Sequence, residues 1–252
     1  MRVFRWVLID LTGGVQTRDH SAISPAALEH VAEAVAAQVN GEFAEHWGAR
    51  ASIRVGAGAD DIEAGEWAFI LRGALPEAPD ASAYHEIRKG VPYAICAVST
   101  CGSLYGPNGV SVDVSHEILE TAGDEAANLF ANNERGELHA LELCDAVELQ
   151  TYRKACRDGT QVHVSNWLLR AWFVPGAAGP FDYMTSVRLP GAVAPAAPLH
   201  TAPGDGGNYQ ILAKWSGERQ VAGARLHIRG TRRKGPELHW SSRAGRRLAQ
   251  VR

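Results

Sequence analysis

The sequence predicts an α+β fold, in which two helices pack on a small sheet. Two observations support this class. Short runs of apolar and β-branched residues are bounded by connections rich in Gly, Asp and Pro, as is typical of strands. Two other segments carry the start and stop signals of helices. Hydrophobic residues make up 46% of the 252 positions, enough for one substantial core.

The first strand is predicted over residues 3–11, where an apolar run ends at the Gly13-Gly14 pair. The first helix follows, because Ser24 is a suitable N-cap and Pro25 suits the first helical position. Its apolar positions recur at helical spacing before the Asn40-Gly41 stop signal: Leu28, Val31, Ala32, Val35 and Val39.

Three more strands are predicted over residues 51–55, 67–71 and 93–99. A loop then leads through residues 110–114 to Ser115, which we expect to cap a second helix. That helix should cover His116 to about Ala122 and end at Gly123-Asp124.

For the remainder of the chain the sequence predicts an irregular region with a strand pair near residues 162–164. Five aromatic residues are expected to belong mainly to its core: Trp167, Trp172, Phe173, Phe181 and Tyr183. The Ala- and Pro-rich residues 190–203 indicate an extended loop or linker. We therefore expect one domain over residues 1–223 and a basic tail over residues 224–252.

Composition excludes several classes of protein. The formal net charge of −3 gives no overall basic field, so nucleic acid is not predicted as the main partner. We find no apolar stretch of membrane-spanning length, and residues 6–11 are too short for a signal-peptide core, so a cytoplasmic protein without a membrane partner is expected. The four cysteines are expected as free thiols, with a Cys96–Cys101 disulfide as the alternative.

Positive charge is concentrated at the end of the chain. Only Glu237 opposes nine basic residues there: Arg225, Arg229, Arg232, Arg233, Lys234, Arg243, Arg246, Arg247 and Arg252. This pattern indicates a solvated tail, or alternatively a segment that contacts nucleic acid or another anionic surface.

The second helix carries the pattern that indicates chemistry. On a helix, His116 and Glu120 share one face, so an imidazole nitrogen and a carboxylate oxygen can bind the same ion. Glu117 lies about 100° around the helix from His116, the position of the general base in the HExxH arrangement. Residues 116–120 therefore form an HExxE motif that predicts one zinc ion, with Glu117 as base.

A catalytic zinc site needs a third protein ligand and an open position. The candidates are Asp145, then Glu142, then Glu148. In a helix Glu142 and Asp145 would share a face, whereas in a strand they would point to opposite faces. Cys144 is expected to pack in the core rather than bind metal. A carboxylate-rich site also leaves manganese and calcium as alternatives.

A string of short blocks resembles a family of uncharacterised bacterial and bacteriophage proteins that share a Ser-His-Glu-x-x-Glu helix. The blocks are Tyr84-His85, Gly90-Val91-Pro92-Tyr93, Ser115 to Glu120, Glu142 to Glu148, Val164-Ser165-Asn166 and Phe181-Asp182-Tyr183. The order of segments over about residues 3–215 is also similar to the zincin metallopeptidases. This chain has Asp124-Glu125 where many relatives carry Asp-Pro.

The resemblance implies a zincin-like fold, in which a small twisted mixed sheet packs on an N-terminal helix and a metal-binding active-site helix, with an irregular C-terminal part. It implies a zinc-dependent metallopeptidase that hydrolyses a peptide or protein substrate. The alternative is a non-catalytic bacteriophage structural or host-interaction protein, virion-associated, with a structural or vestigial metal site. Asp124 and Asn128 are expected either to orient His116 or to form a turn. His85 is expected in a turn or on the surface, with a substrate-side group or an extra metal ligand as the alternative.

Overall fold

The computed structural model describes residues 2–78, 81–127, 129–132, 137–192, 194 and 211–214. The chain divides into two compact units, each interrupted in the sequence. Unit 1 consists of residues 1–123 and 151–165, and unit 2 consists of residues 124–150 and 166–252. The predicted boundary between residues 223 and 224, and the basic tail beyond it, lie outside the described residues.

Unit 1 is built on a five-stranded mixed sheet with strand order β2-β1-β3-β5-β4. Its strands are β1 (Arg2–Leu11), β2 (Ala49–Gly56), β3 (Trp67–Arg72), β4 (Ala83–Arg88) and β5 (Val91–Ala97). All neighbours pair in parallel except β4, which lies at the edge and runs antiparallel to β5. Residues 6–9 of β1 are buried in succession, as expected for a strand inside a sheet that is covered on both faces.

Strand β4 was not among the strands predicted from the sequence. A two-residue turn, Lys89-Gly90, joins it to β5 in a hairpin, with Arg88 paired to Val91. Both turn residues have positive φ, 51° and 82°, as a type I′ hairpin turn requires. The glycine allows this conformation at no steric cost, so the Lys-Gly pair is the local signal for the hairpin.

Helix α1 (Pro25–Gln38) begins as predicted, because Ser24 Oγ accepts a hydrogen bond from the backbone N–H of Ala27. Helix α1 ends at Gln38, and Gly41 of the predicted stop signal has non-helical backbone angles, φ −91° and ψ −115°. A π-helical turn (Val39–Phe43), kinked at Gly41, leads into the short helix α2 (Ala44–Trp47). The predicted stop signal therefore separates α1 from α2.

Helix α3 (Val110–Gly123) ends as predicted but begins earlier than expected. Ser115 is not its N-cap and lies inside the helix. There Ser115 Oγ donates a hydrogen bond to Gln38 Oε1 of α1 at 2.7 Å and accepts one from the backbone N–H of Ser165 at 3.0 Å. The serine thus joins α3 to its neighbours instead of starting it.

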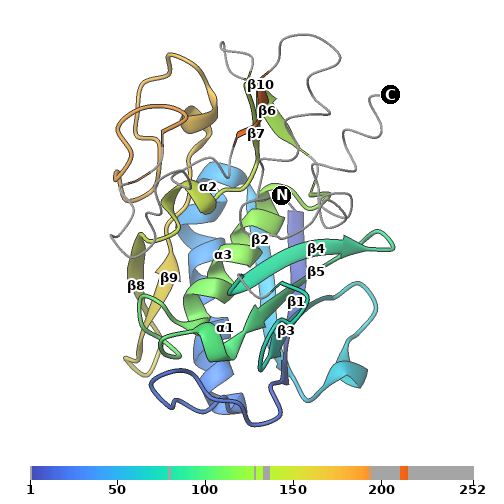
Figure 1. Ribbon diagram of the computed structural model, residues 1–252. Coiled ribbons are helices and arrows are strands. Elements are labelled where there is room, and N and C mark those ends of the chain that lie inside the picture. Colours follow the sequence, from blue (N-terminus) through green and yellow to red (C-terminus); the bar gives the residue numbers. More distant parts are fainter. Residues whose placement is uncertain are drawn as a thin grey trace. The chain divides into compact units, whose positions relative to one another are not determined.

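A hairpin of β8 (Thr151–Ala155) and β9 (Gln161–Ser165) completes unit 1 and confirms the strand pair predicted near residues 162–164. Helix α1 packs against β2, α3 packs against β4 and β5, and the hairpin packs against both helices. Figure 1 shows α1 and α3 between the sheet and this hairpin. Two short 3₁₀ turns lie in the connections, Ala59–Asp61 and Val98–Thr100.

Unit 2 contains a three-stranded antiparallel sheet in the order β10-β7-β6. Its elements are β6 (Phe130–Asn132), β7 (Glu137–Ala140), β10 (Ile211–Lys214) and the 3₁₀ turns Asp145–Val147 and Arg170–Phe173. Of the five aromatic residues predicted for the core, Trp167, Trp172 and Phe181 are buried. Phe173 is partly buried, and Tyr183 is exposed and its ring stacks on that of Trp167.

The elements confirm the predicted α+β class. Within the part of the chain that the structure covers, no helix has both the length and the apolar character needed to cross a membrane. The four cysteines all lie in that part and form no disulfide, in line with the predicted free thiols.

Candidate metal centre

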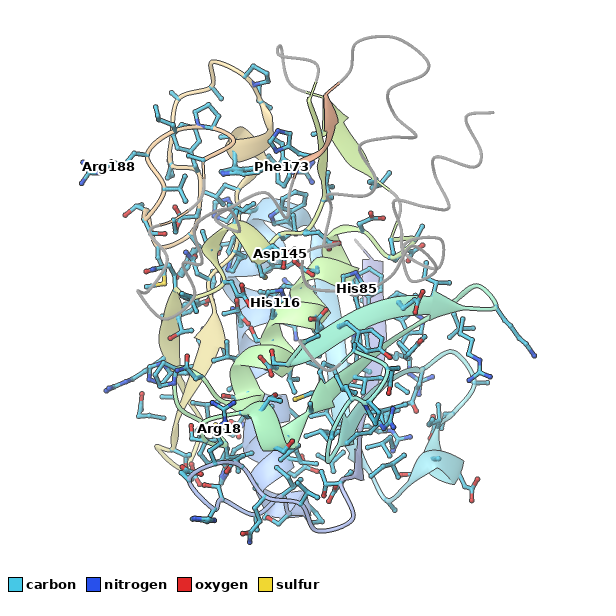
Figure 2. All side chains as sticks on the ribbon, viewed as in Figure 1. Arg18, His85, His116, Asp145, Phe173 and Arg188 are labelled. Atoms are coloured by element: carbon cyan, nitrogen blue, oxygen red, sulfur yellow. The ribbon has the colours of Figure 1, made fainter. Side chains whose placement is uncertain are left out.

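The register of the sheet decides which side chains face α3. His85 of β4 pairs with Ala94 of β5, so His85, Ala94 and Cys96 share one face of the sheet, because side chains alternate along a strand. Helix α3 packs against these two strands. His85 is 6% exposed and its side chain forms a hydrogen bond to α3, and Figure 2 labels it beside the helix.

Helix α3 presents three ionisable side chains in one buried group. His116, Glu117 and Glu120 are 9%, 5% and 0% exposed. As expected for positions i and i+4, His116 and Glu120 meet on one face of the helix, with His116 Nε2 3.4 Å from Glu120 Oε1. The sequence-predicted pair is therefore brought together by the helix alone.

His85 adds a fourth ionisable group, a position that the sequence indicated only as the alternative to a turn or surface residue. Its Nδ1 makes a 2.7 Å hydrogen bond with Glu117 Oε2 and lies 3.4 Å from Glu120 Oε2. The two oxygens of Glu120 thus lie between the two histidines. The expectation of a turn or surface position for His85 is wrong, because β4 places it on the face of the sheet that α3 covers.

Two distances in this group separate a hydrogen-bonded pair of side chains from a pair that could bind one metal ion. Nitrogen and oxygen ligands bound to zinc at roughly 2.0–2.1 Å in a tetrahedron lie about 3.3 Å from each other. The 3.4 Å separation of His116 Nε2 and Glu120 Oε1 fits that geometry and is long for a hydrogen bond. The 2.7 Å between His85 and Glu117 is instead typical of a charge-assisted hydrogen bond.

A second arrangement shares Glu120. One ligand atom from each of His85, Glu117 and Glu120 lies within 4.8 Å of the other two, so these three side chains are also compatible with one ion. In both arrangements the donors are imidazole nitrogen and carboxylate oxygen, which zinc accepts together. The residues present therefore fit a metal ion, with Glu120 as the ligand common to both sets.

The candidates for the third ligand belong to unit 2. Glu142 is buried and lies in an irregular segment, while Asp145 begins a 3₁₀ turn, so neither the helix nor the strand considered for this segment is correct. Cys144 is buried, as expected for a packing residue. Because Glu142, Asp145 and Glu148 lie in a different unit from α3, their part in the site stays a prediction.

Asp124 occupies the turn after α3. Its Oδ2 accepts a 2.6 Å hydrogen bond from the backbone N–H of Leu129, so the turn interpretation is supported for this residue. Asn128, the other residue predicted to orient His116 or form the turn, lies outside the described residues.

Comparisons of the chain with protein-family models, with curated proteins and with solved structures found no match.

Proposed function

We propose that the protein is a zinc-dependent hydrolase of zincin-like fold that cleaves an amide bond in a peptide. His116 and Glu120 are the zinc ligands of α3, with Asp145 or Glu142 as the predicted third ligand, and Glu117 is the general base. The observation that carries the proposal is the 3.4 Å approach of His116 Nε2 to Glu120 Oε1 in a buried group that also contains Glu117.

The fold around α3 supports a peptide as substrate. Strand β4 is at the edge of the sheet and carries His85, the hydrogen-bond partner of Glu117. The backbone groups along the outer side of an edge strand can pair with an extended peptide and hold it in register. A peptide bound along β4 would therefore lie beside the α3 residues that carry the chemistry.

The roles of the side chains follow from their contacts. Zinc, when bound, would lower the pKa of a water molecule and polarise the carbonyl group under attack. His85 holds Glu117 through Oε2, so Glu117 Oε1 is the atom that would take the proton from the attacking water. Glu117 would then deliver this proton to the leaving amine. His85 acts in this scheme as a positioning residue.

The test combines metal analysis with a peptide-cleavage assay. Zinc content is measured for the wild type, Glu120→Ala, His116→Ala and Glu117→Gln, and each is assayed on a library of internally quenched peptides. We expect Glu120→Ala and His116→Ala each to bind one zinc equivalent less than the wild type. Glu117→Gln should keep its zinc and lose about 10²–10⁴-fold in rate, the usual contribution of a general base.

The same zinc analysis identifies the third ligand. Asp145→Asn and Glu142→Gln are compared, and the true ligand is the one whose loss weakens zinc binding. Equal zinc content in the wild type, His116→Ala and Glu120→Ala, after zinc is supplied, would overturn the proposal. The buried His and Glu residues would then be a structural polar network, which fits the vestigial site of the non-catalytic alternative.

A further inference from the structure

A second group of side chains that could bind a metal ion lies in unit 1 and shares no residue with the candidate metal centre. Cys96 is on β5, Cys101 directly follows the 3₁₀ turn Val98–Thr100, and Asp113 is in the first turn of α3. The two cysteines are 0% and 3% exposed, and Asp113 is partly buried. Three elements thus bring two thiols and a carboxylate together at one point.

The three ligand atoms form a nearly regular triangle. Cys96 Sγ and Cys101 Sγ are 3.7 Å apart, and both approach the same oxygen, Asp113 Oδ2, at 3.5 and 3.4 Å. In a tetrahedral zinc site two sulfur ligands at about 2.3 Å lie about 3.8 Å from each other, and a sulfur and an oxygen ligand about 3.6 Å. The observed edges differ from these values by 0.2 Å or less.

We propose that Cys96, Cys101 and Asp113 form a second, structural metal site that binds zinc. Two thiolates and a carboxylate favour a borderline-soft ion, whereas calcium and magnesium require a larger set of oxygen ligands. The fourth position falls to a water molecule or to the Ala97 carbonyl oxygen, which lies 3.5 Å from Cys101 Sγ. This inference does not depend on the proposed hydrolase.

Burial explains why an ion would be held here. A charged carboxylate is poorly solvated beside the two buried thiols of Cys96 and Cys101. A cation among the three side chains would offset that cost. The thiols must also lose their protons to bind the ion, so binding at this site would release protons and weaken as the pH falls.

The position of the site suggests its role. Asp113 precedes Glu117 by four residues, so the triangle lies one turn of α3 from the candidate metal centre. On the sheet, Cys96 is two residues beyond Ala94, the partner of His85, and this spacing along a strand nearly equals one helical turn. A metal ion at Cys96, Cys101 and Asp113 would fix α3 against β5 and thereby hold Glu117 opposite His85.

Cobalt substitution separates the two sites. A cobalt ion bound by thiolates shows an intense ligand-to-metal charge-transfer band in the near ultraviolet, which a site of imidazole and carboxylate ligands lacks. We expect this band when cobalt is added to the reduced wild type and to Glu120→Ala. It should be absent in Cys96→Ser and Cys101→Ser. Cys156→Ser, which removes another buried cysteine of unit 1, is the matched control and should keep the band.

Zinc competition with a chromophoric chelator tests the third ligand. Asp113→Asn should weaken zinc binding more than tenfold in the Glu120→Ala background. The proposal is overturned if the wild type gives no charge-transfer band while circular dichroism shows it folded, or if Asp113→Asn binds zinc as tightly as its parent. A Cys96–Cys101 disulfide in protein purified under mild reduction, detected by thiol alkylation and mass spectrometry, would also overturn it. These outcomes are independent of peptide cleavage.

Discussion

His85 Nδ1 and Glu117 Oε2 lie 2.7 Å apart, and the two side chains are almost completely buried. They come from β4 and α3, which are separate in sequence and joined in space by the packing of the helix on the sheet. A buried carboxylate depends on such a partner, because removing the partner leaves an uncompensated charge in a region of low polarity.

We therefore expect His85→Ala to lower the free energy of unfolding by about 3–5 kcal/mol in the presence of a chelator. His85→Gln, which keeps a hydrogen-bond donor, should lose less. Urea denaturation followed by circular dichroism measures both. The exposed His46 serves as control, and His46→Ala should change stability by no more than about 0.5 kcal/mol. A similarly small effect of His85→Ala would show that Glu117 does not depend on it.

The buried polar network between the helices and β9 gives a second prediction. Ser115 Oγ contacts both Gln38 and the Ser165 backbone, and Gln38 Nε2 donates to the Ser165 carbonyl at 2.8 Å. Ser115→Ala leaves buried groups without their partner, so it should cost about 1–3 kcal/mol. Because Gln38 and Ser115 share one network, a double-mutant cycle of Gln38→Ala and Ser115→Ala should give a coupling energy above about 0.5 kcal/mol. Additive effects would contradict a shared network, and Ser52→Ala, at the exposed position of β2, is the control.

The loss of stability in acid should depend on Glu66. Arg54 contacts both carboxylate oxygens of Glu66, at 2.9 and 2.7 Å, and these hydrogen bonds lower the pKa of Glu66 below its ordinary value. A carboxylate with a lowered pKa contributes stability above its ordinary pKa, and this contribution is lost as the pH falls through the lowered value. Glu66→Gln should therefore cost about 1–2 kcal/mol at pH 7 and progressively less below about pH 4.5.

Urea denaturation at a series of pH values measures this difference between the wild type and Glu66→Gln. The exposed Glu63, which contacts Arg5, is the matched control, and Glu63→Gln should give a nearly flat difference. A Glu66→Gln penalty that stays constant from pH 7 to pH 3 would show that the effect is steric rather than electrostatic.

The start of α3 should tolerate no side chain at Gly109. Its carbonyl accepts hydrogen bonds from the N–H groups of Val112 and Asp113, which places it at the helix cap. A Cβ atom there would lie 2.8 Å from the Gly106 carbonyl oxygen and 3.0 Å from that of Leu104. Since backbone atoms cannot rotate away, Gly109→Ala should cost about 1–3 kcal/mol. Thermal denaturation measures this loss. Gly58→Ala, where a Cβ meets nothing within 4 Å, is the control and should leave the stability nearly unchanged.

The parts of the fold that could be predicted are those with local signals. Ser24 and Pro25 mark the start of α1, and the apolar run of residues 3–11 marks β1. The start of α3 was missed because Val110, Val112 and Val114 are β-branched and favour a strand by themselves. Tertiary packing and the cap at Gly109 override that preference, which no short stretch of sequence reveals.

The same distinction applies to the site. His116, Glu117 and Glu120 could be grouped from the sequence because the spacing of one helical turn brings them together. The positions of His85 and Cys96 depend on how β4 and β5 pair and on which face α3 covers, and both are long-range properties. The Lys89-Gly90 turn was the one local clue to the hairpin, and it gives the face of His85 only once the pairing is known.

The interruption of unit 1 by residues 124–150 has a consequence for how the protein is made on the ribosome. When Gly123 has been added, all residues of the sheet and of α1, α2 and α3 have been synthesised, but those of the hairpin that packs on α1 and α3 have not. At about 5–20 residues per second, Ser165 follows roughly 2–8 s later. During this interval Gln38 and Ser115 lack the Ser165 backbone groups to which they hydrogen-bond in the folded protein, so this buried network is completed last.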